Sequence, residues 1–330
     1  KRVALSTKDI IGQGGEADIF RFKSGEVLKL FKPPNHADFT LDQTAATAAR
    51  ERIQEHQQKL RNFPQGLPHC VIAPNALALD DKQQIVGYTM RFIEGAEVLL
   101  KYGERGFREQ GVSDQEATAL LVALHRALSE IHGKKVVIGD CNDINILIKG
   151  GDVFCIDADS YQFGNYLTRT FTTKFVDPIL CDPHASKPRL AKPHHALSDW
   201  YAFAIMVMQT LLFVGPYGGV YRPKDKKKMV PQEARPLRRI TIFGQDIIYP
   251  KPARPLEVLP DDLLHYFATI FEKDGRDVFA RALLDNLVWR SCAHCGTTHT
   301  RIICPTCATK APGIVREREV IRGSVKATRL

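Results

Sequence analysis

The sequence predicts an α+β fold of two lobes, followed by a small metal-binding module. Three observations predict it: the first third is rich in strand patterns, most of the remainder is rich in helix patterns, and four of the eight cysteines cluster after residue 290. With 330 residues and 44% apolar residues, the chain is long enough to bury a core in each of two lobes. We expect a first lobe at residues 1–95, a second at 96–288, and the cysteine module with a basic tail at 289–330.

The first lobe is expected to contain strands and one helix. Apolar and polar residues alternate around a glycine cluster at 3–25, and a short apolar run at 27–31 predicts a further strand. Residues 41–63 lack glycine and proline and are rich in alanine, glutamine, glutamate and arginine, which predicts a helix. Pro64-Gln65-Gly66 ends this helix, and residues 85–93 predict another strand.

The second lobe is expected to be mainly helical. Helices are predicted at 114–132, 199–214 and 261–288, with a long excursion at 216–260 that carries short strands at 240–243 and 247–249. The most apolar run, 200–214, is shorter than the about 18 residues that crossing a bilayer requires. We therefore expect a buried core helix there and no membrane-spanning segment.

Charge and cysteine usage bound the partners and the compartment. The formal net charge is +9, and the basic residues gather at 224–228, at 235–239 and in the last fifteen residues. Aromatic residues do not alternate with them, so we expect a solvated basic surface rather than nucleic-acid binding. The other four cysteines are scattered, and no signal peptide is visible, which favours a reducing, cytoplasmic location; these cysteines are Cys70, Cys141, Cys155 and Cys181.

A glycine-rich segment stands near the N-terminus. Gly12, Gly14 and Gly15 lie within the run 11–20, and glycines let a hairpin bring its backbone N–H groups close to phosphate oxygens. The same glycines are also compatible with an ordinary turn.

A lysine interrupts the next apolar strand. Lys29 stands within 27–31, where an unpaired ammonium would be costly to bury. The strand resembles the V-A-I-K strand of kinases, and this resemblance implies that Lys29 holds phosphate groups. A glutamate of the 41–63 helix should pair with Lys29, with Glu55 preferred over Glu51. The alternative is a lysine of an edge strand that reaches outward to solvent.

The strongest pattern lies at 138–160. Asp140 and Asn145 are five residues apart, and Asp157 follows an apolar strand seventeen residues after Asp140. A carboxylate that accepts a proton, together with an amide and a second carboxylate that bind Mg²⁺, is the set that phosphoryl transfer needs. The alternative is a β-hairpin whose turn carries Asp and Asn for turn geometry alone.

These motifs together resemble the protein kinase superfamily over residues 8–288. More narrowly, the strings IGDCNDINILI and FCIDADSYQF are similar to those of a bacterial kinase-like group with G-D-L-N-x-x-N and I-D-x-D-S motifs, some of which occur beside tellurite-resistance-type stress genes. The resemblance implies ATP and Mg²⁺ as cofactors, with Asp140 as the base, Asn145 and Asp157 as metal ligands, and Lys29 as the phosphate clamp.

The resemblance also implies a nucleotide-binding hinge at 90–97. Met90 would be the gatekeeper, the backbones of Arg91 and Ile93 would bind the adenine edge, and Glu97 would reach the ribose. Asp199 would cap the buried helix that begins near it and would brace the catalytic loop.

Departures from the kinase pattern limit what the resemblance implies. Ile138-Gly139 replaces His-Arg before the base, so a phosphorylated loop would lack its usual arginine partner. Asn142 replaces a lysine, Ala158-Asp159 replaces Phe-Gly, and residues 175–183 match the substrate-docking segment poorly.

Two C-x-x-C pairs stand at the C-terminal end. Cys292, Cys295, Cys304 and Cys307 offer four thiolates, the ligand set of a closed, structural Zn²⁺ site in a zinc ribbon. A redox pair is the alternative, and His294 and His299 are possible substitute ligands.

The sequence thus predicts an ATP- and Mg²⁺-dependent serine/threonine protein kinase of an atypical, non-RD type, which acts on a protein substrate or signalling partner. Two alternatives remain open: a nucleotide-binding pseudokinase or scaffold, and a small-molecule kinase similar to aminoglycoside phosphotransferases. A nucleic-acid module built on the cysteine pairs is a further alternative.

Overall fold

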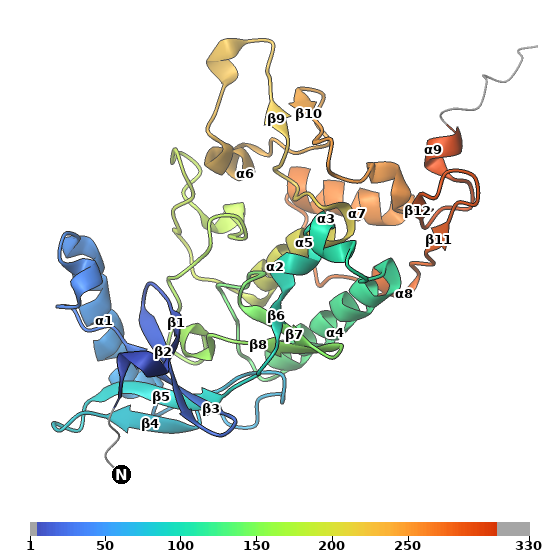
Figure 1. Cartoon of the computed structure of the whole chain (residues 1–330). Helices are drawn as coiled ribbons and strands as arrows, with labels where there is room; N and C mark the ends of the chain where they lie inside the picture. Colours follow the sequence, from blue (N-terminus) through green and yellow to red (C-terminus); the bar gives the residue numbers. More distant parts are fainter. Residues whose placement is uncertain (1–4, 309–330) are drawn as a thin grey trace, which may run out of the picture.

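The computed structural model describes residues 5–308, and it has two lobes (Figure 1). The first lobe is built on a five-stranded antiparallel sheet, and the second is mainly helical. The predicted α+β class is confirmed, as is the four-cysteine cluster near the C-terminus. The basic tail expected at the end of the chain lies outside the described residues.

The sheet of the first lobe has the order β1-β2-β3-β5-β4. Its strands are β1 Ile10–Gln13, β2 Ala17–Lys23, β3 Glu26–Phe31, β4 Ala76–Leu79 and β5 Ile85–Arg91. Lys29 of β3 stands opposite Tyr88 of β5. Beside this pair β5 carries Gly87, where a Cβ atom would collide with the carbonyl oxygen of Lys29. Glycine at position 87 therefore lets β3 and β5 approach each other closely beside Lys29.

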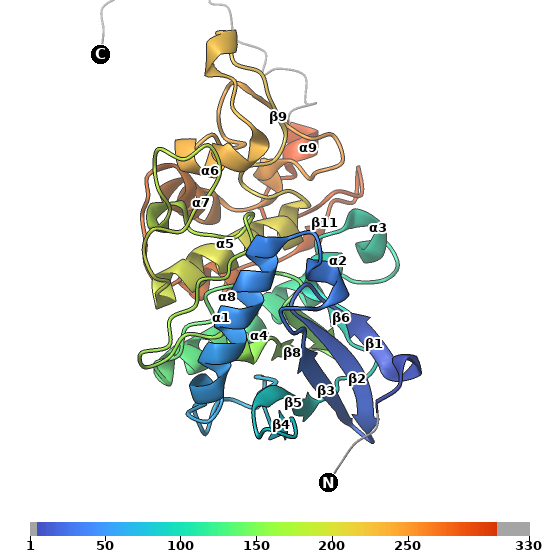
Figure 2. The same ribbon diagram turned by 90° about the vertical axis from the view of Figure 1, so that its left-hand side faces the viewer.

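One long helix, α1 (Gln43–Lys59), lies beside this sheet, as Figures 1 and 2 both show. The Asp42 side chain caps it by accepting a hydrogen bond from the Ala45 N–H. The Gln57 amide bonds both the N–H and the carbonyl of Ile85, at 2.8 and 2.9 Å, which joins α1 to β5. Most other α1 side chains are exposed, so the helix is attached along a narrow face.

The second lobe surrounds the apolar helix α5 (Ala196–Leu212), whose residues from Ser198 to Leu212 are all buried. Among residues 5–308, no helix combines the length and the apolar character needed to cross a lipid bilayer. The remaining helices and strands of residues 97–308 are β6 Glu97–Val98, α2 Leu99–Tyr102, α3 Arg105–Arg108, α4 Asp114–Gly133, β7 Ile146–Lys149, β8 Asp152–Cys155, β9 Val220–Tyr221, α6 Arg235–Arg238, β10 Ile247–Ile248, α7 Asp261–Glu272, α8 Ala282–Asp285, β11 Arg290–Ser291, β12 Thr298–His299 and α9 Pro305–Ala308.

Two expected elements differ from the structure. The single helix expected at 261–288 is divided into α7 and α8, because Asp274 adopts a left-handed φ of 56° and Gly275 follows it. The strand expected at 240–243 is absent from the described chain, where these residues form a turn, whereas β10 coincides with the strand expected at 247–249.

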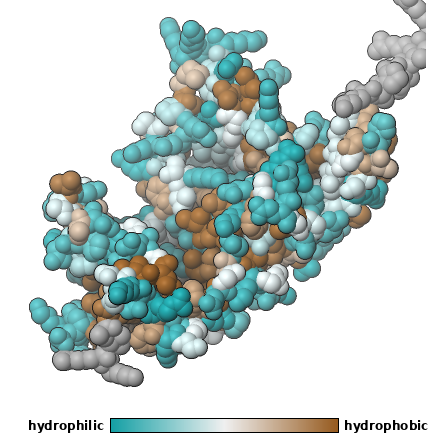
Figure 3. All heavy atoms as spheres, in the orientation of Figure 1, coloured by the Kyte–Doolittle hydropathy of each residue, from teal (hydrophilic) through white to brown (hydrophobic). Residues whose placement is uncertain are grey.

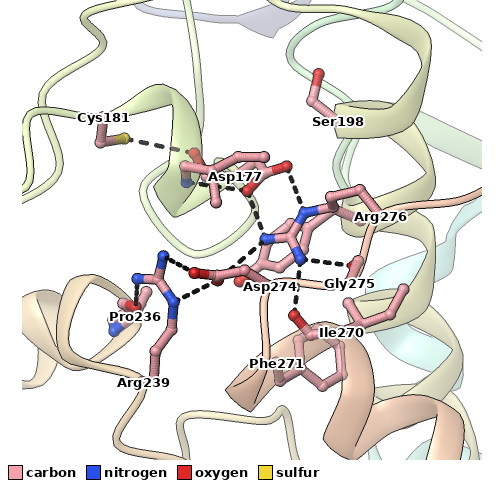
Figure 4. A network of polar contacts seen from close by, with 12 residues as sticks. Asp177, Cys181, Ser198, Pro236, Arg239, Ile270, Phe271, Asp274, Gly275 and Arg276 are labelled. Carbon is pink, nitrogen blue, oxygen red and sulfur yellow. Dashed lines mark hydrogen bonds and ion pairs between the residues drawn. The ribbon is translucent and has the colours of Figure 1, made fainter.

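The interruption after α7 positions a buried ion pair, shown in Figure 4. Arg276 donates two hydrogen bonds to Asp177, at 2.8 and 2.7 Å, and a further bond to the Ile270 carbonyl. Its guanidinium also lies over the ring of Tyr201, 4.5 Å from the centroid. These contacts fix Asp177, which is the last residue of the segment 157–177. The C-terminal end of that segment is therefore anchored to the second lobe.

We expect Asp177→Ala to lower the free energy of unfolding by about 3 kcal/mol, because the buried Arg276 loses both hydrogen bonds to Asp177 and keeps only a longer contact, 3.9 Å, with the partly exposed Asp274. Urea denaturation measures this change. Asp285→Asn is the matched control, since it removes one partner of an exposed pair with Arg281 and should cost under about 0.5 kcal/mol. Equal effects of the two substitutions would contradict the anchoring role of Asp177.

Candidate active site and metal centre

A cavity of about 1070 Å³ lies between the lobes. Its walls come from the glycine-rich hairpin, β3, the 90–93 segment, the 140–147 loop, Asp157 and residues 169–172. Figure 3 shows apolar side chains gathered in the middle of this face of the molecule, with hydrophilic side chains on either side. The volume is that of a site for a drug-sized or nucleotide-sized ligand.

The glycine-rich hairpin forms the roof of the cavity. Gly12, Gly14 and Gly15 all line it. The Gly14 N–H donates to the Ala17 carbonyl at 2.9 Å, and the buried Lys32 ammonium donates to the Gly14 carbonyl at 2.7 Å. These hydrogen bonds fix the turn. Because glycines have no side chains, the backbone of the turn is open to the cavity.

Lys29 reaches across the cleft to the second lobe. Its ammonium donates to Asp157 at 2.5 Å and to Asp159 at 2.7 Å. Burial alone would lower the pKa of Lys29, but the Asp159 and Asp157 carboxylates outweigh burial and raise it well above its usual value. The predicted convergence of Lys29 and Asp157 is therefore present, and Lys29 does not reach outward to solvent.

The expected pairing of Lys29 with Glu55 is contradicted. Glu55 is exposed on α1, whereas its neighbour His56 is buried and approaches Asp159, the partner of Lys29. The His56 ring stacks on Phe31 with centroids 4.6 Å apart, and its Nε2 lies 3.8 Å from an Asp159 oxygen. One residue along a helix changes direction by about 100°, so the choice of Glu55 placed the wrong face inward.

The catalytic loop is held by the buried Asp199. Its carboxylate accepts the N–H groups of Ile138 and Gly139 at 2.8 and 2.9 Å, and it lies 2.9 Å from His132 Nε2. The expected bracing role is thus observed, but the cap of α5 is the His195 side chain rather than Asp199. Gly139 has a φ of 75°, and a Cβ there would collide with Thr168, which explains why no arginine stands before Asp140.

A chain of amide hydrogen bonds orders the loop around Asp140. The Asn142 side-chain nitrogen donates to an Asp140 carboxylate oxygen at 3.0 Å and to the Thr172 hydroxyl at 3.0 Å. The Asn145 side-chain nitrogen donates to the Asp140 carbonyl at 3.1 Å. With its nitrogen engaged, Asn145 has its amide oxygen available as a ligand for a cation.

The expected hinge residues divide into two groups. Met90, Arg91 and Ile93 line the cavity, together with apolar side chains from both lobes such as Val27. Glu97 does not line it and instead forms an ion pair with Lys101 at 2.6 Å. The adenine contacts of the first group and the ribose contact of Glu97 stay predictions.

The cavity residues fit a nucleotide with a magnesium ion. Asp140, Asn145 and Asp157 present carboxylate and amide oxygens at the mouth, which are the ligands that hard cations prefer. Lys29 and Arg169 line the same cavity and supply positive charge for phosphate oxygens.

Several site residues were missed from the sequence. The Tyr88 hydroxyl donates to Asp159 at 2.5 Å, and the two residues complete the surroundings of Lys29. His56 lies against Asp159, and Thr172 lines the cavity. The second aspartate of the string IDADS was a usable signal for Asp159, whereas no local pattern distinguishes Tyr88 or His56 from other residues.

The C-terminal cysteine pairs converge. All four Sγ atoms lie within 4.8 Å of one another, with 3.7 Å between Cys292 and Cys307 and 3.6 Å between Cys295 and Cys304. Tetrahedral Zn–S bonds of about 2.3 Å place sulfur atoms about 3.8 Å apart, so the cluster fits a zinc ribbon. His299 is buried and His294 exposed, and neither belongs to the cluster.

The cysteine module is attached to the second lobe. Thr300 donates its N–H and its hydroxyl to the Val258 carbonyl, both at 2.9 Å. Trp289 is buried and donates its indole N–H to Thr118 of α4 at 2.9 Å. The module therefore packs onto the helical lobe just before α7.

No protein-family model matches the chain, and no curated protein does. Among solved structures, the chain is similar to the protein kinase PK-1 of Cydia pomonella granulovirus, at 14% identity and a TM-score of 0.46, over 79% of this chain and 84% of that chain. The function proposed below rests on the two lobes and the cavity between them, and not on this likeness.

We expect the free energy of unfolding of His56→Leu to fall less steeply with decreasing pH, below pH 7, than that of the wild type. Burial lowers the pKa of His56 from 6.5 to about 4, and the nearby Lys59 and Lys29 charges act in the same direction against the opposing effect of Asp159. Between about pH 4 and pH 6.5 the unfolded chain binds a proton that the folded chain does not, so stability falls as the pH falls through this window.

Relative to pH 7, the proton that His56 binds only in the unfolded chain lowers the free energy of unfolding at pH 5 by about 2 kcal/mol. Chemical denaturation of wild type and variant at pH 7 and pH 5 measures the difference between the two slopes. Identical pH slopes would show that His56 is not held neutral by burial.

We expect metal analysis to find about one zinc ion per chain and to find it lost in Cys292→Ser, because three thiolates hold zinc less tightly than four. Cys70→Ser is the control, since Cys70 lies outside the cluster and should leave the metal content unchanged. Full zinc content in Cys292→Ser would reject the ligand set.

Proposed function

We propose that this chain is an ATP- and Mg²⁺-dependent phosphotransferase that acts on serine or threonine hydroxyl groups of a protein partner. The observation that carries the proposal is the contact of Lys29 with Asp157 across the mouth of a cavity that Asp140 and Asn145 also line. An ammonium from one lobe and oxygen ligands from the other converge at one place, as phosphoryl transfer requires.

The cavity offers a separate environment for each part of the nucleotide. The apolar wall around Val27 and Met90 suits a purine ring, and the glycine-rich hairpin leaves backbone groups open to phosphates. Asn145 and Asp157 would hold Mg²⁺, which supplies charge neutralisation for the phosphate oxygens. Lys29 would bind the phosphate oxygens nearest the hairpin.

Asp140 is the proposed base. It would orient the acceptor hydroxyl and take its proton while the hydroxyl oxygen forms a bond to the terminal phosphorus atom. The bond from that phosphorus to the bridging oxygen breaks, and ADP leaves with the electron pair. Asn142 supports this role because it fixes the Asp140 carboxylate by a hydrogen bond of 3.0 Å.

The segment from Asp157 to Asp177 supports a protein as the acceptor. Arg169–Thr172 form one side of the cavity beside Asp140, and Asp177 is anchored by Arg276 at the far end. In this proposal an extended peptide binds along this segment, with its hydroxyl group toward Asp140.

One observation favours a second candidate, a nucleotide-binding pseudokinase. Asn142 stands where protein kinases have a lysine, and its side-chain nitrogen is engaged by Asp140 and Thr172. No cation at this position faces the terminal phosphate, so binding without transfer is the outcome that this substitution favours. From the second lobe, Arg169 is the cationic side chain that lines the cavity in the described part of the chain.

We expect purified wild-type chain with labelled ATP and Mg²⁺ to transfer label to itself or to a serine- and threonine-containing peptide mixture. Asp140→Asn and Asp157→Asn should lower the rate by about 100-fold or more, because each removes a group that acts directly on the reacting atoms. Asp152→Asn, at the exposed start of β8, is the control that should keep the wild-type rate.

A wild-type rate in Asp140→Asn would reject the assignment of the base. A thermal shift with ATP and Mg²⁺ in wild type, with no transfer to any acceptor, would favour the pseudokinase.

A further inference from the structure

The two carboxylates that bind Lys29 differ in what else they face. The Asp157 side chain is 32% exposed and lines the cavity, whereas the Asp159 side chain is 5% exposed and does not line it. Both accept a hydrogen bond from the same ammonium, at 2.5 and 2.7 Å. Only Asp157 is therefore placed to exchange the lysine for a ligand in the cavity.

Besides Lys29, Asp159 is fixed by contacts from two other elements and by the turn to which it belongs. The Tyr88 hydroxyl of β5 donates to the carboxylate oxygen that also accepts from Lys29, at 2.5 Å. His56 of α1 approaches the other oxygen to 3.8 Å. Below it, the 3-10 turn Ala158–Ser160 is closed by Ser160, which donates its N–H and its hydroxyl to the Asp157 carbonyl at 3.0 and 2.8 Å.

We propose that Asp159 is the positioning residue for Lys29, in the place of a carboxylate from α1, and that this leaves Asp157 free to bind the magnesium ion. The inference rests on the proposed function, since it concerns how the phosphate clamp of that site is held. It assigns different tasks to two aspartates that are two residues apart in one turn.

Charge supports this division of tasks. One ammonium faces two carboxylates, so the cluster of Lys29, Asp157 and Asp159 carries a net negative charge and can accept a cation. When a cation takes Asp157, Lys29 keeps a full carboxylate partner in Asp159 and avoids becoming an unpaired buried charge. A single carboxylate could not serve both the cation and the lysine in this way.

No carboxylate of α1 takes part in the clamp. Glu51 and Glu55 are exposed on α1, and neither is a partner of Lys29. Instead, α1 contacts the glycine-rich hairpin through the ion pair of Arg52 with Glu16, at 2.8 Å, and it contacts the clamp through His56 beside Asp159.

The experiment compares Asp159→Asn with the double variant Glu51→Gln/Glu55→Gln in the full chain. The readouts are kcat, the KM for ATP in the presence of Mg²⁺, and the Kd of ADP with Mg²⁺ by calorimetry. We expect Asp159→Asn to lower kcat/KM by about 10- to 100-fold, as removal of a supporting partner of a site residue does. The glutamate double variant should match wild type within about twofold, as surface substitutions do.

A double-mutant cycle separates positioning from a purely structural role. Asp159→Asn should have little further effect on kcat/KM in a Lys29→Met background, because it acts through Lys29 alone. Equal effects of Asp159→Asn with and without Lys29, or a loss of activity in the glutamate double variant with none in Asp159→Asn, would overturn the inference.

Failure of the proposed function has a different signature. A wild-type chain that binds neither ATP nor ADP with Mg²⁺ rejects the proposed function, and the inference with it. If the wild type binds ADP with Mg²⁺ but transfers no phosphate, the Kd of ADP is the deciding measurement. Weaker ADP binding by Asp159→Asn than by the glutamate double variant supports the positioning role. Equal binding by the two variants rejects it.

Discussion

The buried ammonium of Lys29 is the constraint on which the cleft depends. A lysine inside an apolar strand must find negative charge, and the carboxylates that satisfy it belong to Asp157 and Asp159 of the other lobe. The interaction that makes this lysine tolerable is thus also the one that closes the two lobes on a common site. Gly87 and Tyr88 on the neighbouring strand serve the same end, one by allowing close approach and the other by bonding Asp159.

The opposite wall of the cleft is held in place by buried charged side chains of the helical lobe, which form hydrogen bonds to the loops of that wall. Asp199 on α5 holds the backbone before Asp140, and Arg276 after α7 holds Asp177 at the end of the cleft segment. Both anchors are side chains of the buried core that reach a loop by hydrogen bonds. The loops around the cavity therefore derive their order from α5 and from the turn after α7, in addition to the hydrogen bonds that Asn142 and Asn145 donate within the loop around Asp140.

The parts of the site that the sequence predicted are those defined by short-range spacing. Asp140, Asn145 and Asp157 belong to one loop and the hairpin that follows it, so their separation in sequence nearly determines their separation in space. The face of α1 could not be derived in the same way, because its exposed and polar residues provide no apolar stripe to set the phase, and His56 rather than Glu55 faces inward. The division of the 261–288 helix depends on Asp274 and Gly275, whose turn is stabilised by the distant partner Asp177 of Arg276.

The most direct test is a crystal structure with Mg²⁺ and a non-hydrolysable ATP analogue. We expect the triphosphate to lie beneath the glycine-rich hairpin, the cation to bind Asn145 and Asp157, and Lys29 to bond both a phosphate oxygen and Asp159. A nucleotide bound elsewhere, or a Lys29 that leaves Asp159 for a glutamate of α1, would contradict the proposed site.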